Sequence, residues 1–195
     1  MFKKINQNEF IINNKGAVIL ELVFIISIIA LFIKLLLSMA AYQSTVGKLD
    51  RISYSIAGIV RERTRLYDND NVLTQAQVEK LKQLTEQMLL NSGAHYNNIA
   101  IKIETLNFND TDSPNLIDKI IDERNSLSLS AGTVACNPTQ PLHEMDSLSP
   151  YGNTGRWIPL YQVTLCLPTI PWYSTLFSPK TPAPAIKSSA ITIER

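Results

Sequence analysis

The most apolar part of the chain is the 25-residue run from Ala17 to Ala41. Its only interruptions are Glu21, Ser27, Lys34 and Ser38. A helix needs about 20 mostly apolar residues to cross a bilayer, so this run predicts a transmembrane helix. Lys34 lies toward the far end of the run, where a long side chain can carry its amine to the interface. We therefore interpret Lys34 as a snorkelling residue.

The apolar pattern continues beyond the run with the spacing of an amphipathic helix. Its members recur at steps of three and four residues: Val46, Leu49, Ile52, Ile56, Ile59 and Val60. The opposite face carries Lys48, Arg51, Arg61, Arg63 and Arg65, with Asp50 and Glu62 between them. This face is interpreted as a solvated surface with local ion pairs, and the alternative is a basic contact strip for a partner subunit. The pattern predicts that the helix extends through residues 42–67.

Residues 67–71, "YDNDN", are turn formers and end this predicted helix. Thr74 and Gln77 then have the spacing of a capping box, ahead of a second helical stripe formed by Val78, Leu81, Leu84, Met88 and Leu89. Residues 98–105 alternate apolar and polar positions, which predicts a half-buried strand. Further strands are predicted over 126–136, 157–167 and 185–194, and residues 115–124 suit either a short helix or a loop. Residues 72–195 are thus predicted to form an α+β head with an antiparallel sheet.

Composition limits the size and the chemistry of this head. The chain has 195 residues, 45% of them hydrophobic, with 17 acidic and 18 basic side chains. That length allows one modest globular core beside the apolar run. No basic block interleaved with aromatic residues occurs, so we expect no nucleic-acid partner.

Glu21 needs an explanation, because a central acidic residue costs about 2.5 to 3.5 kcal/mol on membrane-insertion scales. Cleavage after Gly16 would create a cationic amine at Ala17, four residues before Glu21. Positions i and i+4 share a helix face, so the amine and the carboxylate could pair within one chain or between staggered chains. Alternatively, Glu21 lies at the headgroup boundary, where the helix dipole favours an acidic residue.

The segment "KGAVILE", Lys15 to Glu21, resembles the processing site of a type IV prepilin. The segments 52–67 and 156–166 are similar to the F-type pseudopilins of the tight-adherence (Tad or Flp) pilus system. The resemblance implies that a prepilin peptidase removes residues 1–16 as a leader and that Glu21 sets subunit registration. This sequence departs from the family pattern at Leu22, where an aromatic residue is common, and at Lys34, which interrupts the apolar run.

This resemblance implies an exported head, in which Cys136 and Cys166 should form a disulfide; two buried free thiols are the alternative. Closing a loop of about 30 residues would stabilise the head by roughly 3 to 4 kcal/mol. Residues 167–184 combine five prolines with Trp172, Tyr173 and Phe177. These aromatic residues suit either a partner surface or the edge of the core.

Candidate enzyme chemistry is scarce in the sequence. His95 and His143 are the only histidines, and the surroundings of His143 lack the second histidine of a zinc helix. Asp110 and Asp112 lack the full spacing of a calcium loop and are interpreted as a solvated turn. We therefore expect no enzymatic activity, no cofactor and no metal site.

The sequence is thus interpreted as a minor pseudopilin with a leader (1–16), a transmembrane helix (17–41), an outer stem (42–67) and a periplasmic head (72–195). It would be anchored in lipid in the bacterial inner membrane by a single span. Its partners would be the prepilin peptidase, other pilins and the inner-membrane assembly platform. The alternatives are an unprocessed single-span sensor or binding module, and a protein secreted by signal peptidase cleavage after Ala40.

Overall fold

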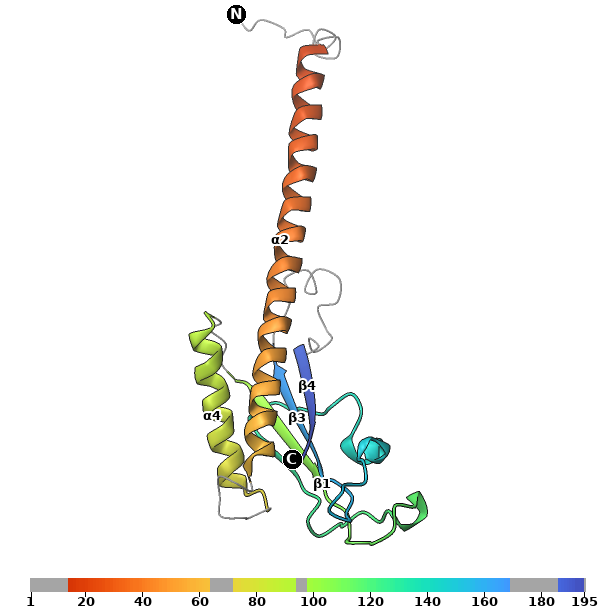
Figure 1. Cartoon of the computed structure of the whole chain (residues 1–195). Helices are drawn as coiled ribbons and strands as arrows, with labels where there is room; N and C mark the ends of the chain where they lie inside the picture. Colours follow the sequence, from red (N-terminus) through yellow and green to blue (C-terminus); the bar gives the residue numbers. More distant parts are fainter. Residues whose placement is uncertain (1–13, 64–71, 94–97, 169–185, 195) are drawn as a thin grey trace, which may run out of the picture. The chain divides into compact units, whose positions relative to one another are not determined.

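The computed structural model describes residues 14–63, 72–93, 98–168 and 186–194, and divides the chain into two compact units, residues 1–43 and 44–195 (Figure 1). Helix α2 (Asn14–Arg61) contributes to both units. Among the described residues, it is the one helix long and apolar enough to cross a membrane. The predicted end of this helix near Tyr67 lies outside the described residues, as does the turn at 67–71.

Helix α4 (Gln75–Asn91) begins where the sequence pattern places it. The backbone N–H of Thr74 donates to Gln77 Oε1 at 3.0 Å, which satisfies a polar group at the start of the helix. Val78 and Leu89 are buried, and Leu81, Leu84 and Met88 pack against the same core. The predicted stripe is therefore confirmed as the buried face of α4.

Four strands form one antiparallel sheet in the order β2-β1-β3-β4. They are β1 (Ala100–Leu106), β2 (Ser128–Ala131), β3 (Leu160–Leu167) and β4 (Ile186–Ile193). Their register places Ile103 opposite both Leu129 and Val163, and Val163 opposite Ala190. With the two helices, this sheet confirms the predicted α+β class.

Strand β2 is shorter than the predicted strand 126–136, and Cys136 lies outside it. Gly132 has a φ of +126°, which favours glycine, and a Cβ at this position would lie 2.7 Å from Ala100 Cα. The chain therefore leaves the sheet directly after Ala131, where the backbone passes close to β1.

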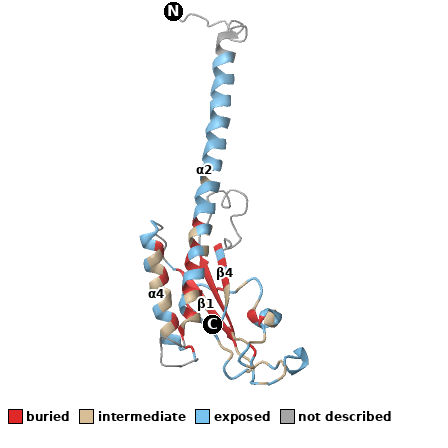
Figure 2. Ribbon diagram, in the orientation of Figure 1, coloured by how far each residue is buried: buried red, intermediate tan, exposed pale blue. Residues whose placement is uncertain are grey.

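Helices α2 and α4 cover one face of this sheet, which we call the helix face (Figures 1 and 2). Gln75 Nε2 of α4 donates to the Ser130 carbonyl of β2 at 2.9 Å. On α2, the Ser53 hydroxyl shares a 2.8 Å hydrogen bond with Ser188 of β4. Between the helices and the sheet lies an apolar core that includes Leu49, Ile56, Leu89, Ile101, Ile103, Val163 and Leu165.

The other face, which we call the loop face, is covered by residues 136–149, named here the covering segment. This segment contains the 3-10 helix η2 (Leu142–Leu148), which contacts β1 and β3. The strand predicted over residues 98–105 is confirmed as β1, but its predicted half-burial is wrong, because Ala100 and Glu104 on the face opposite the isoleucines are buried too. Both faces of β1 are therefore covered.

Residues 115–124 are mainly a loop, with one short 3-10 helix, η1 (Leu116–Asp118). Further along, Ile121 forms an isolated antiparallel bridge with Phe108. This bridge attaches the loop to the chain that follows β1. The short helix and the loop that the sequence left open for this segment are thus both present in part.

Candidate functional site

The part of α2 in the first unit presents a continuous apolar surface. Every described residue from Val18 to Leu37 is exposed, and Phe24, Leu36 and Leu37 are each exposed by more than 60%. A soluble monomer rarely exposes so large a contiguous apolar surface. Its length and composition suit a lipid environment or packing against other apolar helices.

Gly16 and Ala17 lie in α2, whose described part begins at Asn14 of the uncleaved chain. Glu21 lies four residues after Ala17 and is exposed. Within the described residues, its carboxylate forms no hydrogen bond or ion pair. Both the cleavage at Gly16 and the role of Glu21 in subunit registration stay predictions.

The predicted basic strip is divided by the fold of the head. Arg63 is buried, at 6% exposed, and its guanidinium donates to the Val72 carbonyl. Arg63 is therefore part of the head's interior, contrary to the solvated position assigned to it from sequence. Arg61 remains partly exposed and pairs with Glu62 at 3.1 Å. Arg65, Trp172, Tyr173 and Phe177 lie outside the described residues.

A disulfide joins the covering segment to the loop face. Cys136 and Cys166 are bonded with an S–S distance of 1.98 Å, and both are buried. Cys166 belongs to β3, whereas Cys136 begins the covering segment. Together with Ala100 they form a small buried cluster at one end of the face.

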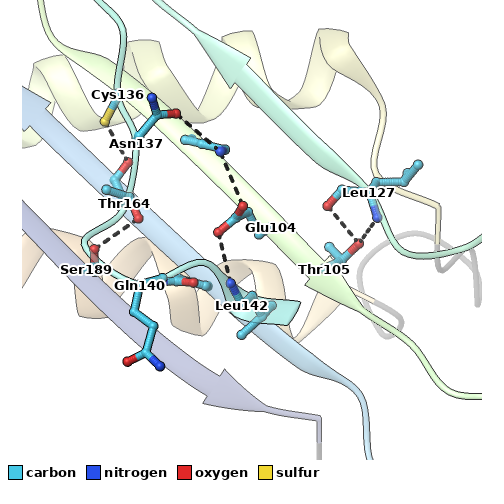
Figure 3. A network of polar contacts seen from close by, with 11 residues as sticks. Glu104, Thr105, Leu127, Cys136, Asn137, Gln140, Leu142, Thr164 and Ser189 are labelled. Atoms are coloured by element: carbon cyan, nitrogen blue, oxygen red, sulfur yellow. Dashed lines mark hydrogen bonds and ion pairs between the residues drawn. The ribbon is translucent and has the colours of Figure 1, made fainter. Parts of the chain in front are cut away.

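Polar side chains in the middle of the loop face hold the next part of the covering segment (Figure 3). Glu104 pairs with Lys102 at 3.3 Å and accepts a hydrogen bond from the Leu142 backbone N–H at 3.4 Å. Lys102 Nζ also donates to Asn137 Oδ1 at 3.4 Å. On β3, Gln162 Nε2 donates to the Gln140 carbonyl at 3.2 Å. The covering segment is therefore held by β1 at Asn137 and Leu142, and by β3 at Gln140 between them.

An apolar cluster completes the far end of the loop face. Leu142 is 2% exposed and packs with Leu106 and Leu160, and Met145 contacts the same cluster. The covering segment is therefore fixed by a covalent bond at one end, polar contacts in the middle and apolar packing at the other end. This arrangement can order a segment that has no strand partner of its own.

Lys119 organises the loops beside this cluster. Its ammonium donates to the carbonyls of Asp146 and Ser149, the latter at 3.1 Å. It also lies 4.4 Å from the ring centroid of Trp157 and 4.8 Å from that of Phe108. Desolvation by burial lowers the pKa of Lys119, and the nearby Asp146 carboxylate partly opposes this effect. The lysine thus turns into the head instead of toward solvent.

A polar cleft of about 350 Å³ lies next to these loops. It is lined by Asn107, Phe108, Asn109, Asp110, Asp122, Asn125, Arg156, Trp157, Pro159 and Glu194. Hydrogen bonds from Asn125 and from the Arg124 backbone lower the pKa of Asp122, with the Asn125 side chain the larger cause. Within the described ranges, no three His, Cys, Asp or Glu side chains are grouped to hold a metal ion. Asp112 and His143 are exposed, and His95 lies outside those ranges.

Sequence reasoning missed both Glu104 and Lys119. Glu104 was assigned to the solvated face of a strand, and its Leu142 contact is 38 residues away. Lys119 lies in the segment whose structure the sequence left open, and its position between Ile117 and Ile120 gives no sign that the charge faces inward. The one signal in the sequence was the cysteine pair, because a bond between Cys136 and Cys166 would bring the residues near 136 to the strand that holds Cys166.

Comparison with known proteins provides one match. A family model described as "Putative tight adherence pilin protein F" (TadF) matches residues 9–195, which is nearly the whole chain. No curated protein and no solved structure matches it.

Proposed function

Because the chain belongs to the TadF family of tight adherence pilin proteins, we propose that it acts as a minor pseudopilin in the assembly, priming or tip structure of a Tad pilus. The observation that carries this proposal is the exposed apolar surface of α2 on a chain of that family. Such a surface suits storage in the membrane and later packing against other pilin helices. The chain would thus have a structural function, with energy supplied by the assembly machinery.

The size of the head supports a specialised role. The major subunit of such a pilus is little more than a helix, whereas the second compact unit of this chain, residues 44–195, adds an α+β head. A filament core needs only the helices, so a head of this size suits a subunit placed at a tip or in an adaptor complex.

The disulfide supports a periplasmic location for the head. Disulfides persist in oxidising compartments and are rare in the reducing cytosol. With the head outside, the span would cross the inner membrane once, and residues 1–16 would stay accessible to a prepilin peptidase on the cytoplasmic side. The other partners would be pilins packed along α2 and the inner-membrane assembly platform.

Cleavage after Gly16 gives Glu21 a function in this proposal. The new amine of Ala17 would lie four residues before the carboxylate, or beside the carboxylate of a neighbouring staggered chain. Ion pairing in a water-poor environment compensates for the cost of burying the acid only when the partner is well placed. Glu21 would therefore favour one register between adjacent helices.

The mature N-terminus of the protein, purified from the cell that makes it, tests the proposal by N-terminal sequencing and intact mass. We expect the chain to begin at Ala17. An intact Met1 would identify an unprocessed single-span protein, and a start at Ala41 would identify a secreted product. Either result would overturn the proposal.

A Glu21→Gln substitution tests the registration role separately. We expect piliation to fall strongly, because glutamine removes the charge that pairs with the new amine. Glu79→Gln is the matched control, since Glu79 is exposed on α4 outside the apolar helix. Unchanged pilus production in the Glu21 variant, measured by sheared-pilus yield, would contradict a registration role.

A further inference from the structure

The loop that carries Lys119 has an inverted polarity. Its cation faces inward, whereas its neighbours face solvent: Leu116 is 73% exposed, Ile117 92% and Ile120 58%. We call Leu116, Ile117 and Ile120, which lie within five residues of one loop, the apolar tip. Exposed clusters of large aliphatic side chains characterise interaction surfaces.

The rim of the apolar tip is acidic. Residues 107–125 contain five acidic and two basic side chains, and one of the two basic residues is the inward-facing Lys119. Asp118 and Glu123 are exposed, and their carboxylates form no ion pair within the described residues. An anionic membrane would repel this rim, so its chemistry favours a protein partner with an apolar centre and cationic edges.

The head itself offers a surface of that chemistry, in a groove of about 370 Å³ between α2 and α4. It is lined by Lys48, Arg51, Ile52, Ser55, Met88, Asn91 and Ser92. Lys48 and Arg51 form no ion pair with any side chain in the described ranges. Ile52 and Met88 supply apolar contact between these cations and the end of α4. We call this surface the basic groove.

The tip and the groove belong to opposite sides of one sheet. The basic groove lies between the helices that cover the helix face, whereas the tip is attached to the covering segment on the loop face. In Figure 1, residues 116–118 lie beyond the lower end of β1 and apart from α4. A tip therefore has no access to the groove of its own head.

We propose that the apolar tip of one copy docks in the basic groove of a second copy. Ile117 would enter the groove beside Ile52 and Met88, while Asp118 and Glu123 would face Lys48 and Arg51. Such a contact joins two different surfaces, so it is heterologous and can add further copies in one direction or close into a ring. This inference goes beyond the proposed pilus function and does not depend on cleavage after Gly16.

The test uses the full chain in lipid nanodiscs that hold one copy each, so that lipid shields the apolar helix and association reports on the heads. Analytical ultracentrifugation over a concentration series would measure it. We expect concentration-dependent association of the wild-type protein that weakens as salt is raised, because the proposed contact includes exposed charges. A wild-type protein that stays monomeric across the series would overturn the proposal.

Charge reversal separates this contact from unspecific association. Variant A carries Asp118→Lys and Glu123→Lys, and variant B carries Lys48→Glu and Arg51→Glu. Each variant alone should associate at least about tenfold more weakly, because its tip and groove then carry like charges. A mixture of A and B should associate again, because each tip then meets a groove of opposite charge. Failure of the mixture, with both variants melting at the wild-type temperature, would overturn the proposal.

The apolar part of the contact has its own matched pair. Ile117→Ser should weaken association about tenfold or more without lowering the melting temperature, because Ile117 has almost no contact within the head. Val72→Ser, at a position 45% exposed outside both surfaces, should leave association unchanged. Equal effects of the two substitutions would contradict docking through the tip.

Discussion

Two faces of the same sheet are buried in different ways in this head. Two helices cover the helix face, and their side chains meet the strands in an apolar core. The covering segment closes the loop face with a disulfide, buried polar contacts and a small apolar cluster. A helix covers the sheet with apolar side chains that recur at regular spacing, whereas an irregular segment is held by a different specific contact at each point where it meets the sheet. The stability of the two faces should therefore depend on different kinds of residue.

The largest effect is expected from removing the covalent bond on the loop face. The variant with Cys136→Ser and Cys166→Ser should lose about 3 to 4 kcal/mol in the free energy of unfolding, because a closed loop with a separation of 30 residues becomes open. Denaturant titration of the full chain in nanodiscs measures the loss.

The disulfide variant also tests whether the two faces of the sheet unfold separately. Amide exchange should accelerate in the covering segment before it does in α4, because the helices keep their apolar core. Equal acceleration on both sides of the sheet would mean that the two faces do not unfold separately.

A somewhat smaller effect is expected from the helix face. Ile56 is completely buried between α2 and the sheet, so Ile56→Ala should cost about 3 kcal/mol through lost contacts and a residual cavity. Ile59→Ala on the same helix is the control, because Ile59 is 36% exposed, and it should cost less than about 1 kcal/mol. Equal losses in thermal or denaturant unfolding would contradict the assignment of the buried stripe.

The smallest effect concerns one polar contact of the loop face. Glu104→Gln should cost about 1 kcal/mol, because the Lys102 ion pair is lost while an oxygen remains to accept from Leu142. Glu86→Gln breaks the partly exposed pair with Lys82 and should change stability by less than about 0.5 kcal/mol. A loss in the Glu86 variant as large as that in the Glu104 variant would refute the structural role of the buried acid.

The helix face could be predicted from the sequence more fully than the loop face. The spacing of Ile52 and Ile56, and that of Val78 and Leu89, reports directly which side of each helix is buried. Strand positions also agreed with the structure within a few residues, apart from the early end of β2 at Gly132. These features are local, so the residues that determine them are neighbours in the chain.

The loop face depends on partners that sequence spacing does not reveal. Lys102 and Glu104 read as solvent-facing positions, yet Asn137 and Leu142, 35 and 38 residues away, cover them. Arg63 was likewise assigned to solvent, because its acceptor, the Val72 carbonyl, lies beyond the predicted helix. For the candidate site, the apolar helix was predicted, while the inward turn of Lys119 that exposes Ile117 was not.

The Ser53–Ser188 hydroxyl pair joins residues 135 positions apart, so this contact can form only well after Ser53 has been synthesised. At about 5 to 20 residues per second, a ribosome needs roughly 7 to 27 seconds between these two serines. During that interval, the nascent helix around Ile52 and Ile56 lacks the last strand of the sheet that covers it. The apolar stripe of that helix therefore stays incompletely covered until β4 has emerged.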